Sequence, residues 1–476
     1  MIPYRIERDF LGEISIPADA YYGIHTMRAV SNFPVSGFRV PGEFILAMAE
    51  VKKACALANA HTNLIDNRRV HAIIKAAEEI AEGKFADQFI VDAFQGGAGT
   101  STNMNMNEVI ANRAIEILGG RKGDYDLIHP LDHVNLSQST NDVYPTALKV
   151  AAIRLVIALS ETIAKLQGAL QEKEHAFRGI LKLGRTEMQD AVPVTLGQEF
   201  GAYAEAFARD RWRLFKVEER LRQVNLGGTA IGTGLNAERD YIYAAVEELR
   251  NITGLGIARA ENMVDMTQNV DIFAEVSGLV KACAVNLAKV AADLRLLSMG
   301  PRGGIAEISL PRLQEGSSIM PDKVNPVITE MATEVAYQVI CFDQAITAAA
   351  FSGQLELNAF LPLITFNLLN GLKLLINGIT VFRTHCIEGI KVNHDMCRAH
   401  LEESLCLATA LAPYIGHEKA GELSGRARTE NKTIREAALE EGLFTADELD
   451  VIFSPQELTR PGIAGSKVLK RKEKKD

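Results

Sequence analysis

The chain has 476 residues and a formal net charge of −9, with 47% hydrophobic and 23% charged residues. This length suffices for two or three domains around a large core, and the balance is ordinary for a globular protein. The acidic net charge argues against a nucleic-acid-binding protein, and we expect the basic run Lys467–Lys475 to be a solvated terminus. We find no signal peptide and no run of about twenty uncharged apolar residues, so no membrane segment is expected. The six cysteines lack metal-site spacing, which favours reduced thiols and a cytoplasmic location.

Helical periodicity dominates the chain, whereas strand-like alternation is sparse, so we expect a mainly α fold. The first 40 residues, rich in Pro, Gly and Tyr, are interpreted as irregular. The pattern then predicts helices, with approximate bounds, at 42–62, 67–82, 103–117, 143–177, 197–225, 263–299, 327–350 and 361–388, followed by short helices from about 393.

The predicted helix at 263–299 is unusually long and apolar. Val276, Val280, Cys283 and Leu287 alternate spacings of four and three residues, as in the seam of a helical bundle. Other faces of the same helix are apolar too. Such a helix is expected to be buried, either within a large bundle or between subunits.

Four separate stretches place small polar residues just before a predicted helix: 95–105, 137–142, 184–199 and 316–327. The N-terminus of a helix favours anions because its N–H groups are unpaired and its dipole is positive there. If the four stretches converge, they form a site rich in hydrogen-bond donors with one formal cation, Lys323, which suits a small dicarboxylate. No phosphate-binding loop, cofactor fingerprint or metal spacing is present, so no organic cofactor is expected.

The stretch 316–327 carries the sharpest signal. Asn325 suits the N-cap of a helix, and Pro326 its first position. The small residues from Gly316 to Ser318 could form a lid that brings a hydroxyl, a cation and an amide onto a carboxylate. A surface turn that caps a structural helix is an equally good interpretation of this stretch alone. Chemistry at such a lid would remove a proton next to a carboxylate, with the resulting dianion held by fixed donors, and a serine base would need N–H groups and a cation nearby.

Three blocks carry a resemblance to a known family. The segment 316–325 is similar to the signature of the aspartase/fumarase superfamily, and the blocks at 184–199 and 228–236 match two further family motifs. The resemblance runs from about Arg5 to Pro461. Within the superfamily, the stretches 18–26, 95–101 and 138–142 resemble the aspartate ammonia-lyase branch rather than the fumarases.

This resemblance implies a mainly α, three-domain fold with a central bundle of long helices that assembles into a tetrameric core. The implied domains are 1–141, 142–393 and 394–476. It further implies a homotetramer whose active sites each take residues from three subunits, a small dicarboxylate substrate, and neither nucleic acid nor membrane as partner. Activation by a divalent metal cannot be assigned to any residue.

The implied reaction is the reversible elimination of ammonia from L-aspartate to give fumarate, by way of an aci-carboxylate. The resemblance assigns Ser317 as the base that takes the Cβ proton. It assigns the β-carboxylate to Thr100, Ser139, Thr140 and Ser318, the α-carboxylate to Thr186, Lys323 and Asn325, and the amino group to Asn141. The alternatives are a fumarate hydratase acting on L-malate, a related amino-dicarboxylate lyase, or an inactive structural homologue.

Two residues depart from the family pattern. Glu187 follows Gly-Arg-Thr where fumarases and some aspartases have histidine, and a carboxylate there would attract a substrate ammonium. The alternative is an outward-turned surface glutamate, which the neighbouring motif residues disfavour. Asp322 stands where Gly or Ala is usual, and we expect its negative charge beside Lys323 to lower lid mobility or weaken anion binding.

Overall fold

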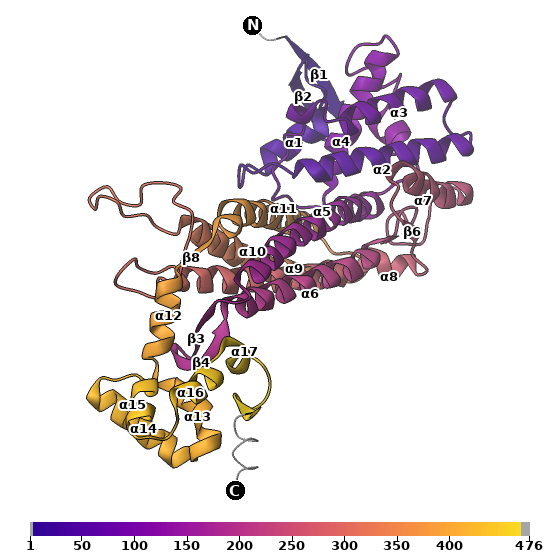
Figure 1. The fold of residues 1–476 in the computed structure, drawn as a ribbon. Helices are drawn as coiled ribbons and strands as arrows, with labels where there is room; N and C mark the ends of the chain where they lie inside the picture. Colours follow the sequence, from indigo (N-terminus) through magenta and orange to yellow (C-terminus); the bar gives the residue numbers. More distant parts are fainter. Residues whose placement is uncertain (1–2, 468–476) are drawn as a thin grey trace. The chain divides into compact units, whose positions relative to one another are not determined.

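The computed structural model describes residues 3–467 as a mainly helical chain with four two-stranded sheets (Figure 1). The chain divides into two compact units, each described by itself. Unit 1 comprises Met1–Glu161, Asp210–Val285 and Val335–Asn377, and unit 2 comprises Thr162–Arg209, Asn286–Glu334 and Gly378–Asp476. The mainly α prediction is confirmed, and the predicted three-domain boundaries stay a prediction. The basic run beyond Lys467 lies outside the described residues.

The N-terminal 40 residues are more regular than predicted. Strands β1 (Tyr4–Asp9) and β2 (Gly12–Pro17) pair antiparallel, with Asp9 opposite Gly12, and helix α1 (Ile24–Asn32) follows. The Arg5 guanidinium donates to the carbonyls of Pro17, Ala20 and Tyr22, which fixes the loop between hairpin and helix. The prediction of an irregular segment was wrong because each strand is only six residues long, too short for alternation to stand out.

In the rest of the N-terminal part of unit 1, helix α2 is the main packing partner of two other helices. Helix α2 (Gly42–His61) packs against both α3 (Asn67–Ala81) and α7 (Arg239–Thr253), and α3 packs against α4 (Thr100–Ile117). The predicted helices at 42–62 and 67–82 are thereby confirmed. The short parallel pair of β5 (Gln223–Val224) and β6 (Ala258–Arg259) lies beside α7.

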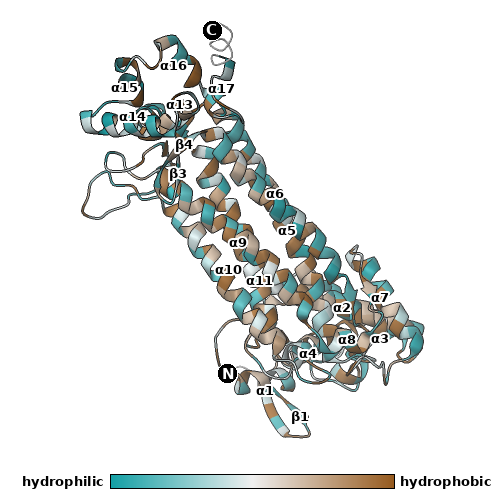
Figure 2. Cartoon of the chain, turned by 90° about the horizontal axis from the view of Figure 1, so that it is seen from below, coloured by the Kyte–Doolittle hydropathy of each residue, from teal (hydrophilic) through white to brown (hydrophobic). Residues whose placement is uncertain are grey.

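Five long helices each contribute residues to both units: α5 (Thr140–Phe177), α6 (Leu196–Leu221), α9 (Asp271–Leu297), α10 (Val327–Phe351) and α11 (Leu361–His385). In unit 1, Ser277 and Lys281 of α9 donate to the Asp343 carboxylate of α10. In unit 2, the Tyr203 hydroxyl of α6 donates to Asp293 of α9 at 3.0 Å. Figure 2 shows hydrophobic and hydrophilic residues interleaved along these helices.

The long helix predicted at 263–299 is broken. Helix α8 (Met263–Gln268) ends before Asn269, whose backbone is extended, and α9 begins at Asp271. Met263, Thr267 and Val270 are all buried, so the apolar phase continues through the break and periodicity alone could not reveal it. The predicted burial of the seam is confirmed, since Val276, Val280, Cys283 and Leu287 are buried.

Unit 2 contains two small sheets and a cluster of short helices. Strands β3 (Leu181–Thr186) and β4 (Gln189–Thr195) form a hairpin, and β7 (Ile308–Ser309) pairs with β8 (Lys391–Val392). The C-terminal helices enclose a core that includes Leu411, Leu423, Ile434 and Leu449. They are α12 (His394–Glu403), α13 (Ala408–Ile415), α14 (His417–Glu430), α15 (Ile434–Glu440), α16 (Ala446–Ile452) and α17 (Pro455–Leu458).

One helical segment of the described chain, Leu361–Gly389, is long and apolar enough to cross a membrane, with a mean hydropathy of 1.3 in its most apolar window. More than half of that window, 56%, is buried inside the structure, as in the core helix of a globular protein. The segment also contains Lys373 and Arg383, which accounts for its not standing out in the sequence.

Candidate active site

The first two polar stretches lie together in unit 1, at the starts of α4 and α5. Before α4, Gly97, Ala98 and Gly99 all have positive φ, and a Cβ on Gly99 would lie 2.2 Å from the Tyr144 ring of α5. The loop can therefore approach α5 only with glycine at that position. Thr100, the first residue of α4, is exposed and donates its hydroxyl to the Gly97 carbonyl at 2.8 Å.

Thr140 and Asn141 are held in defined orientations. The Asn103 amide of α4 donates to the Thr140 Oγ1 at 3.0 Å, which joins the two stretches directly. Asn141 donates its side-chain amide to the Ala230 carbonyl at 2.7 Å, and its backbone N–H donates to the Ser139 Oγ. The bond to Ala230 fixes which way the Asn141 amide faces, and its Oδ1 is the side-chain atom that can accept from a donor such as an ammonium.

Asp142, which was not predicted as a site residue, connects the start of α5 to the loop at 227–229 through hydrogen bonds. Its buried carboxylate accepts the backbone N–H of Ser139 at 2.9 Å and those of Gly227 and Thr229 at 3.1 Å. Burial raises the pKa of Asp142 to about 7, and the three backbone hydrogen bonds oppose that shift. The Gly/Thr loop near 227–236, a family motif in the sequence, is thus tied to the start of α5.

Lys52 of α2, also not predicted, is hydrogen-bonded to the segment that precedes α5. Its ammonium donates to the Asn135 Oδ1 at 3.0 Å and to the Gln138 Oε1 at 2.8 Å. Desolvation lowers the pKa of Lys52 to about 7. The only signal in the sequence is a lysine that stands in the apolar phase of α2, between Met48 and Cys55.

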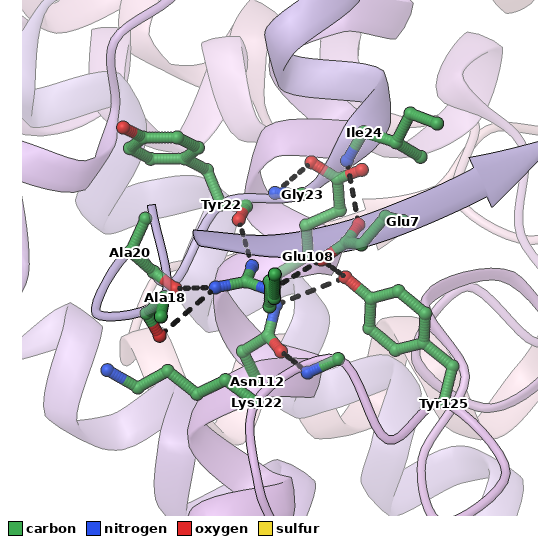
Figure 3. Close-up of polar contacts among 12 residues, drawn as sticks. Glu7, Ala18, Ala20, Tyr22, Gly23, Ile24, Glu108, Asn112, Lys122 and Tyr125 are labelled. Carbon is green, nitrogen blue, oxygen red and sulfur yellow. Dashed lines mark hydrogen bonds and ion pairs between the residues drawn. The ribbon is translucent and has the colours of Figure 1, made fainter. Parts of the chain in front are cut away.

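A second buried carboxylate of unit 1 supports the loop at 18–26 (Figure 3). Glu108 accepts the backbone N–H groups of Gly23, His25 and Thr26, together with the Thr26 hydroxyl. It therefore satisfies the unpaired donors at the N-terminus of α1. Burial raises the pKa of Glu108 to about 7 against these hydrogen bonds. Glu7 completes the cluster by accepting from the Tyr125 hydroxyl at 3.0 Å.

In unit 2, Thr186 and Glu187 lie at the tip of the β3–β4 hairpin. Glu187 and Met188 form the two-residue turn, both with positive φ, and Thr186 and Glu187 are exposed. Below the tip, the fully buried Glu307 carboxylate pairs with Arg185 at 2.9 Å and with Lys182 at 3.1 Å. The hairpin is therefore anchored at its base and open at its tip.

The loop 316–325 is closed at its neck. The Gly316 N–H donates to the Lys323 carbonyl, and the Asn325 amide donates to the Gly316 carbonyl, both at 2.8 Å. Within the loop, the Ser317 Oγ accepts the backbone N–H groups of Ile319 at 3.2 Å and Met320 at 2.9 Å. Ser318 and Lys323 are exposed. Two N–H donors on one hydroxyl oxygen stabilise its alkoxide, which is one part of what a serine base requires.

Two details of this loop differ from prediction. Helix α10 begins at Val327, as the helical spacing predicted, so Pro326 is not its first residue, and Asn325 points its amide at Gly316 rather than capping the helix. Asp322 has a positive φ and forms an ion pair with Arg312, which supplies the counter-charge that the sequence alone did not indicate.

The structure therefore brings Thr100 and Ser139–Asn141 together in unit 1. It describes no hydrogen bond between the hairpin tip at Thr186–Glu187 and the loop 316–325 in unit 2. Among residues 3–467, no group of three His, Cys, Asp or Glu side chains is arranged to hold a metal ion.

Comparison with known proteins agrees with these motifs. Residues 12–341 match a family described as lyase, and residues 407–460 match the fumarase C C-terminus. The chain is 47% identical over 468 residues to the aspartate ammonia-lyase of Bacillus subtilis, covering 98% of each chain. It is 45% identical over 461 residues to that of Escherichia coli K12, covering 96% of each.

Solved structures show the same relationship. The fumarate lyase:delta crystallin of Brucella melitensis, in a structure bound to cobalt, is 47% identical with a TM-score of 0.93, covering 96% of this chain and all of that one. The class II fumarase of Schistosoma mansoni is 33% identical with a TM-score of 0.92 at the same coverage. The chain thus belongs to the aspartase/fumarase superfamily of lyases.

Proposed function

We propose that this enzyme is an aspartate ammonia-lyase that reversibly eliminates ammonia from L-aspartate to give fumarate. Relatives named aspartate ammonia-lyase match nearly the whole chain at 45% to 48% identity. The observation that carries the chemistry is the Ser317 Oγ, which accepts two backbone N–H groups inside the signature loop. A hydroxyl in this environment has its alkoxide stabilised before any substrate arrives.

In the proposed reaction, Ser317 takes the proton from Cβ of aspartate. The electron pair of the broken C–H bond moves into the β-carboxylate and creates an aci-carboxylate dianion. Donors placed where this charge develops lower the barrier. We assign this task to Thr100, Ser139, Thr140 and Ser318. The electron pair then returns to form the C=C bond of fumarate as ammonia leaves from Cα.

The other end of the substrate is assigned to different residues. Thr186, Lys323 and Asn325 bind the α-carboxylate, and the free Oδ1 of Asn141 accepts from the amino group. Glu187, on the same hairpin tip as Thr186, adds a negative charge near this ammonium, which favours an amino acid over L-malate. Its exposure in the single chain is compatible with a site completed by other subunits.

We further propose a cytoplasmic homotetramer with composite active sites. Large apolar side chains stay exposed on the long helices of the single chain, including Trp212, Phe215, Val285, Tyr337 and Phe351. Apolar surface of this kind is usual where subunits pack against each other. The six cysteines are unpaired, as expected in a reducing compartment.

The direct test follows fumarate absorbance while purified protein receives L-aspartate or L-malate separately. We expect fumarate from aspartate alone. Fumarate from malate alone would establish a hydratase instead. With neither substrate active, the ammonia-lyase assignment would be wrong, and other amino dicarboxylates would be tried next.

The base is tested by Ser317→Ala, which removes the only atom able to take the Cβ proton in this scheme. We expect kcat to fall by about a thousandfold or more, with the hydrodynamic size unchanged. Ser352→Ala, at the residue that follows the end of α10, is the matched control and should leave turnover intact. Near-normal activity of Ser317→Ala would refute the assigned base.

A further inference from the structure

The buried ammonium of Lys52 has no part in the reaction as proposed above. The residue is 1% exposed, and its two hydrogen-bond partners, Asn135 and Gln138, are both neutral amides. A buried charge without a hydrogen-bonded counter-ion costs stability. Such a residue beside a candidate site therefore calls for a functional explanation.

Asn135 is the centre of the cluster above Lys52. Its Oδ1 accepts three donors: the Lys52 ammonium at 3.0 Å, the Asn107 amide at 3.1 Å and the Asn103 amide at 3.2 Å. The Asn135 nitrogen donates instead to the Gln138 carbonyl at 3.3 Å. Because the Asn135 oxygen faces Lys52, Asn103 and Asn107, each of these three residues has to direct a hydrogen-bond donor at it.

A lysine can only impose one orientation on such a cluster. Its ammonium has three donors and no acceptor, so the oxygens of Asn135 and Gln138 must face it. The Asn135 oxygen then requires the nitrogen of Asn103, even though the buried Asn103 Oδ1 is left without a hydrogen-bond partner. The same Asn103 nitrogen donates its second N–H to the Thr140 Oγ1 at 3.0 Å.

The chain of hydrogen bonds ends on Thr140. Because the Thr140 Oγ1 accepts from Asn103, its own proton is available for a different acceptor. We infer that Lys52 is a positioning residue: it fixes the direction of the chain through Asn135 and Asn103, so that the Thr140 hydroxyl donates to the substrate carboxylate. This inference rests on the proposed function, which places Thr140 on the β-carboxylate.

The charges around Lys52 are compatible with this role. Asp142 of α5 and Cys55 of α2 face the ammonium, and both favour its charged form. The Asp142 oxygens accept the backbone N–H groups of Ser139, Gly227 and Thr229, whereas the hydrogen bonds of Lys52 go to Asn135 and Gln138. Loss of one proton from Lys52 leaves two N–H groups for Asn135 and Gln138 but adds a lone pair, so the ammonium is the form that imposes the orientation.

A double-mutant cycle tests the inference on the full-length enzyme. Lys52→Met frees the amides to rotate, and we expect kcat to fall about tenfold to a hundredfold while KM changes little, since the lost donor serves the transition state. In a Thr140→Val background, the same change should lower kcat by less than about threefold, because the final link is already missing. Equal losses in both backgrounds would mean a purely structural role and overturn the inference.

Lys149 offers the matched control. It is 2% exposed, desolvation also lowers its pKa to about 7, and it donates to the Gln223 carbonyl and the Met266 sulfur rather than to any site residue. Lys149→Met should leave kcat within about twofold of the parent enzyme in either background. A loss as large as that of Lys52→Met would show that any buried lysine of unit 1 has the same effect, against the inference.

Asn103→Asp keeps the experiment decisive if Lys52→Met fails to fold. A carboxylate has no donor, so Thr140 would have to donate to it, and the direction of the last bond reverses. We expect a kcat loss of about tenfold or more that disappears with Thr140→Val. A loss that persists there would overturn the inference.

The outcome can be separated from that of the proposed function. If malate rather than aspartate is turned over, the same cycle is measured with malate. If neither reacts, calorimetric binding of the 3-nitropropionate nitronate, whose charge resembles that of the aci-carboxylate, replaces kcat. Lys52→Met should then weaken nitronate binding only while Thr140 is present, and equal weakening in both backgrounds would overturn the inference.

Discussion

Two buried lysines of this chain differ in the charge of their partners. Lys52 in unit 1 and Lys182 in unit 2 are each 1% exposed. Lys182 pairs with two carboxylates, Glu199 at 3.2 Å and Glu307 at 3.1 Å, and Glu307 also accepts from Arg185 and His400. Lys52 is hydrogen-bonded only to neutral amides.

The difference separates two uses of a buried charge. The Lys182 cluster is neutralised locally and ties β3, α6, α12 and the segment before β7 together, so its value is structural. The Lys52 ammonium stays without a hydrogen-bonded carboxylate, and its donors determine how the neighbouring amides are oriented. Burial of a charge therefore indicates little by itself until the chemistry of its partners is known.

The largest expected effect comes from removing the ammonium that faces carboxylates. Lys182→Met leaves Glu199 and Glu307 buried with one cation fewer, and we expect the free energy of unfolding to fall by about 3–5 kcal/mol. Urea unfolding measures this change. Lys165→Met, an exposed lysine of unit 2, serves as the control. If Lys182→Met lowered the free energy of unfolding no more than the control does, the structural role of Lys182 would be contradicted.

The same substitution at the other lysine should have the opposite sign. Lys52→Met removes a desolvated charge, so we expect the free energy of unfolding at pH 6 to stay unchanged or rise by up to about 2 kcal/mol. Strong destabilisation of this variant would show that Lys52 is a structural residue like Lys182.

The pH dependence sharpens this prediction. Desolvation lowers the pKa of Lys52 from 10.5 to about 7 in the folded chain, although the neighbouring Cys55 and Asp142 favour the charged form. Between these two values the unfolded state binds more protons, so Lys52 makes the wild-type protein more stable as pH rises. Any advantage of Lys52→Met should therefore be largest below pH 7 and shrink toward pH 10. Urea unfolding of both proteins at pH 6 and pH 9 checks this, and an advantage that grows with pH would contradict it.

The smallest effect is expected at an exposed pair. Asp322 and Arg312 form an ion pair on the surface of unit 2, worth less than about 1 kcal/mol. Asp322 also has a positive φ, which glycine adopts more easily. Asp322→Gly should leave stability nearly unchanged, whereas Asp322→Ala loses the pair without relieving the backbone and should be the less stable variant. The reverse order in urea unfolding would contradict this account.

The sequence predicted most long helices because their apolar residues keep helical spacing, as in α2, α3 and α11. It could not show the break at Asn269, where Thr267 and Val270 continue the buried phase on either side. The sequence did not predict the hairpin of β1 and β2, because hydrogen-bonded pairing between the strands, rather than composition, defines it. The tetramer and the domain boundaries are still predictions.

Within the site, the four polar stretches could be chosen from the sequence because small polar residues before a helix have a recognisable pattern. Lys52 could not, since its partners Asn135 and Gln138 are more than eighty residues away along the chain. Asp142 was visible only as one member of a polar run. Its three backbone donors, two of them from the loop at 227–229, exist only in the folded chain.

The closed neck of the loop 316–325 has a mechanical consequence. Gly316 is bonded to both Lys323 and Asn325, so the ends of the loop cannot separate without breaking those bonds. These bonds keep the two ends of the loop together in any movement, so the bending has to occur in the backbone on both sides, before Gly316 and after Asn325. A fluorescent label on a cysteine introduced at the exposed Met320 would therefore report movement of Ser317, because both residues lie in the same closed loop and Met320 N–H donates to Ser317.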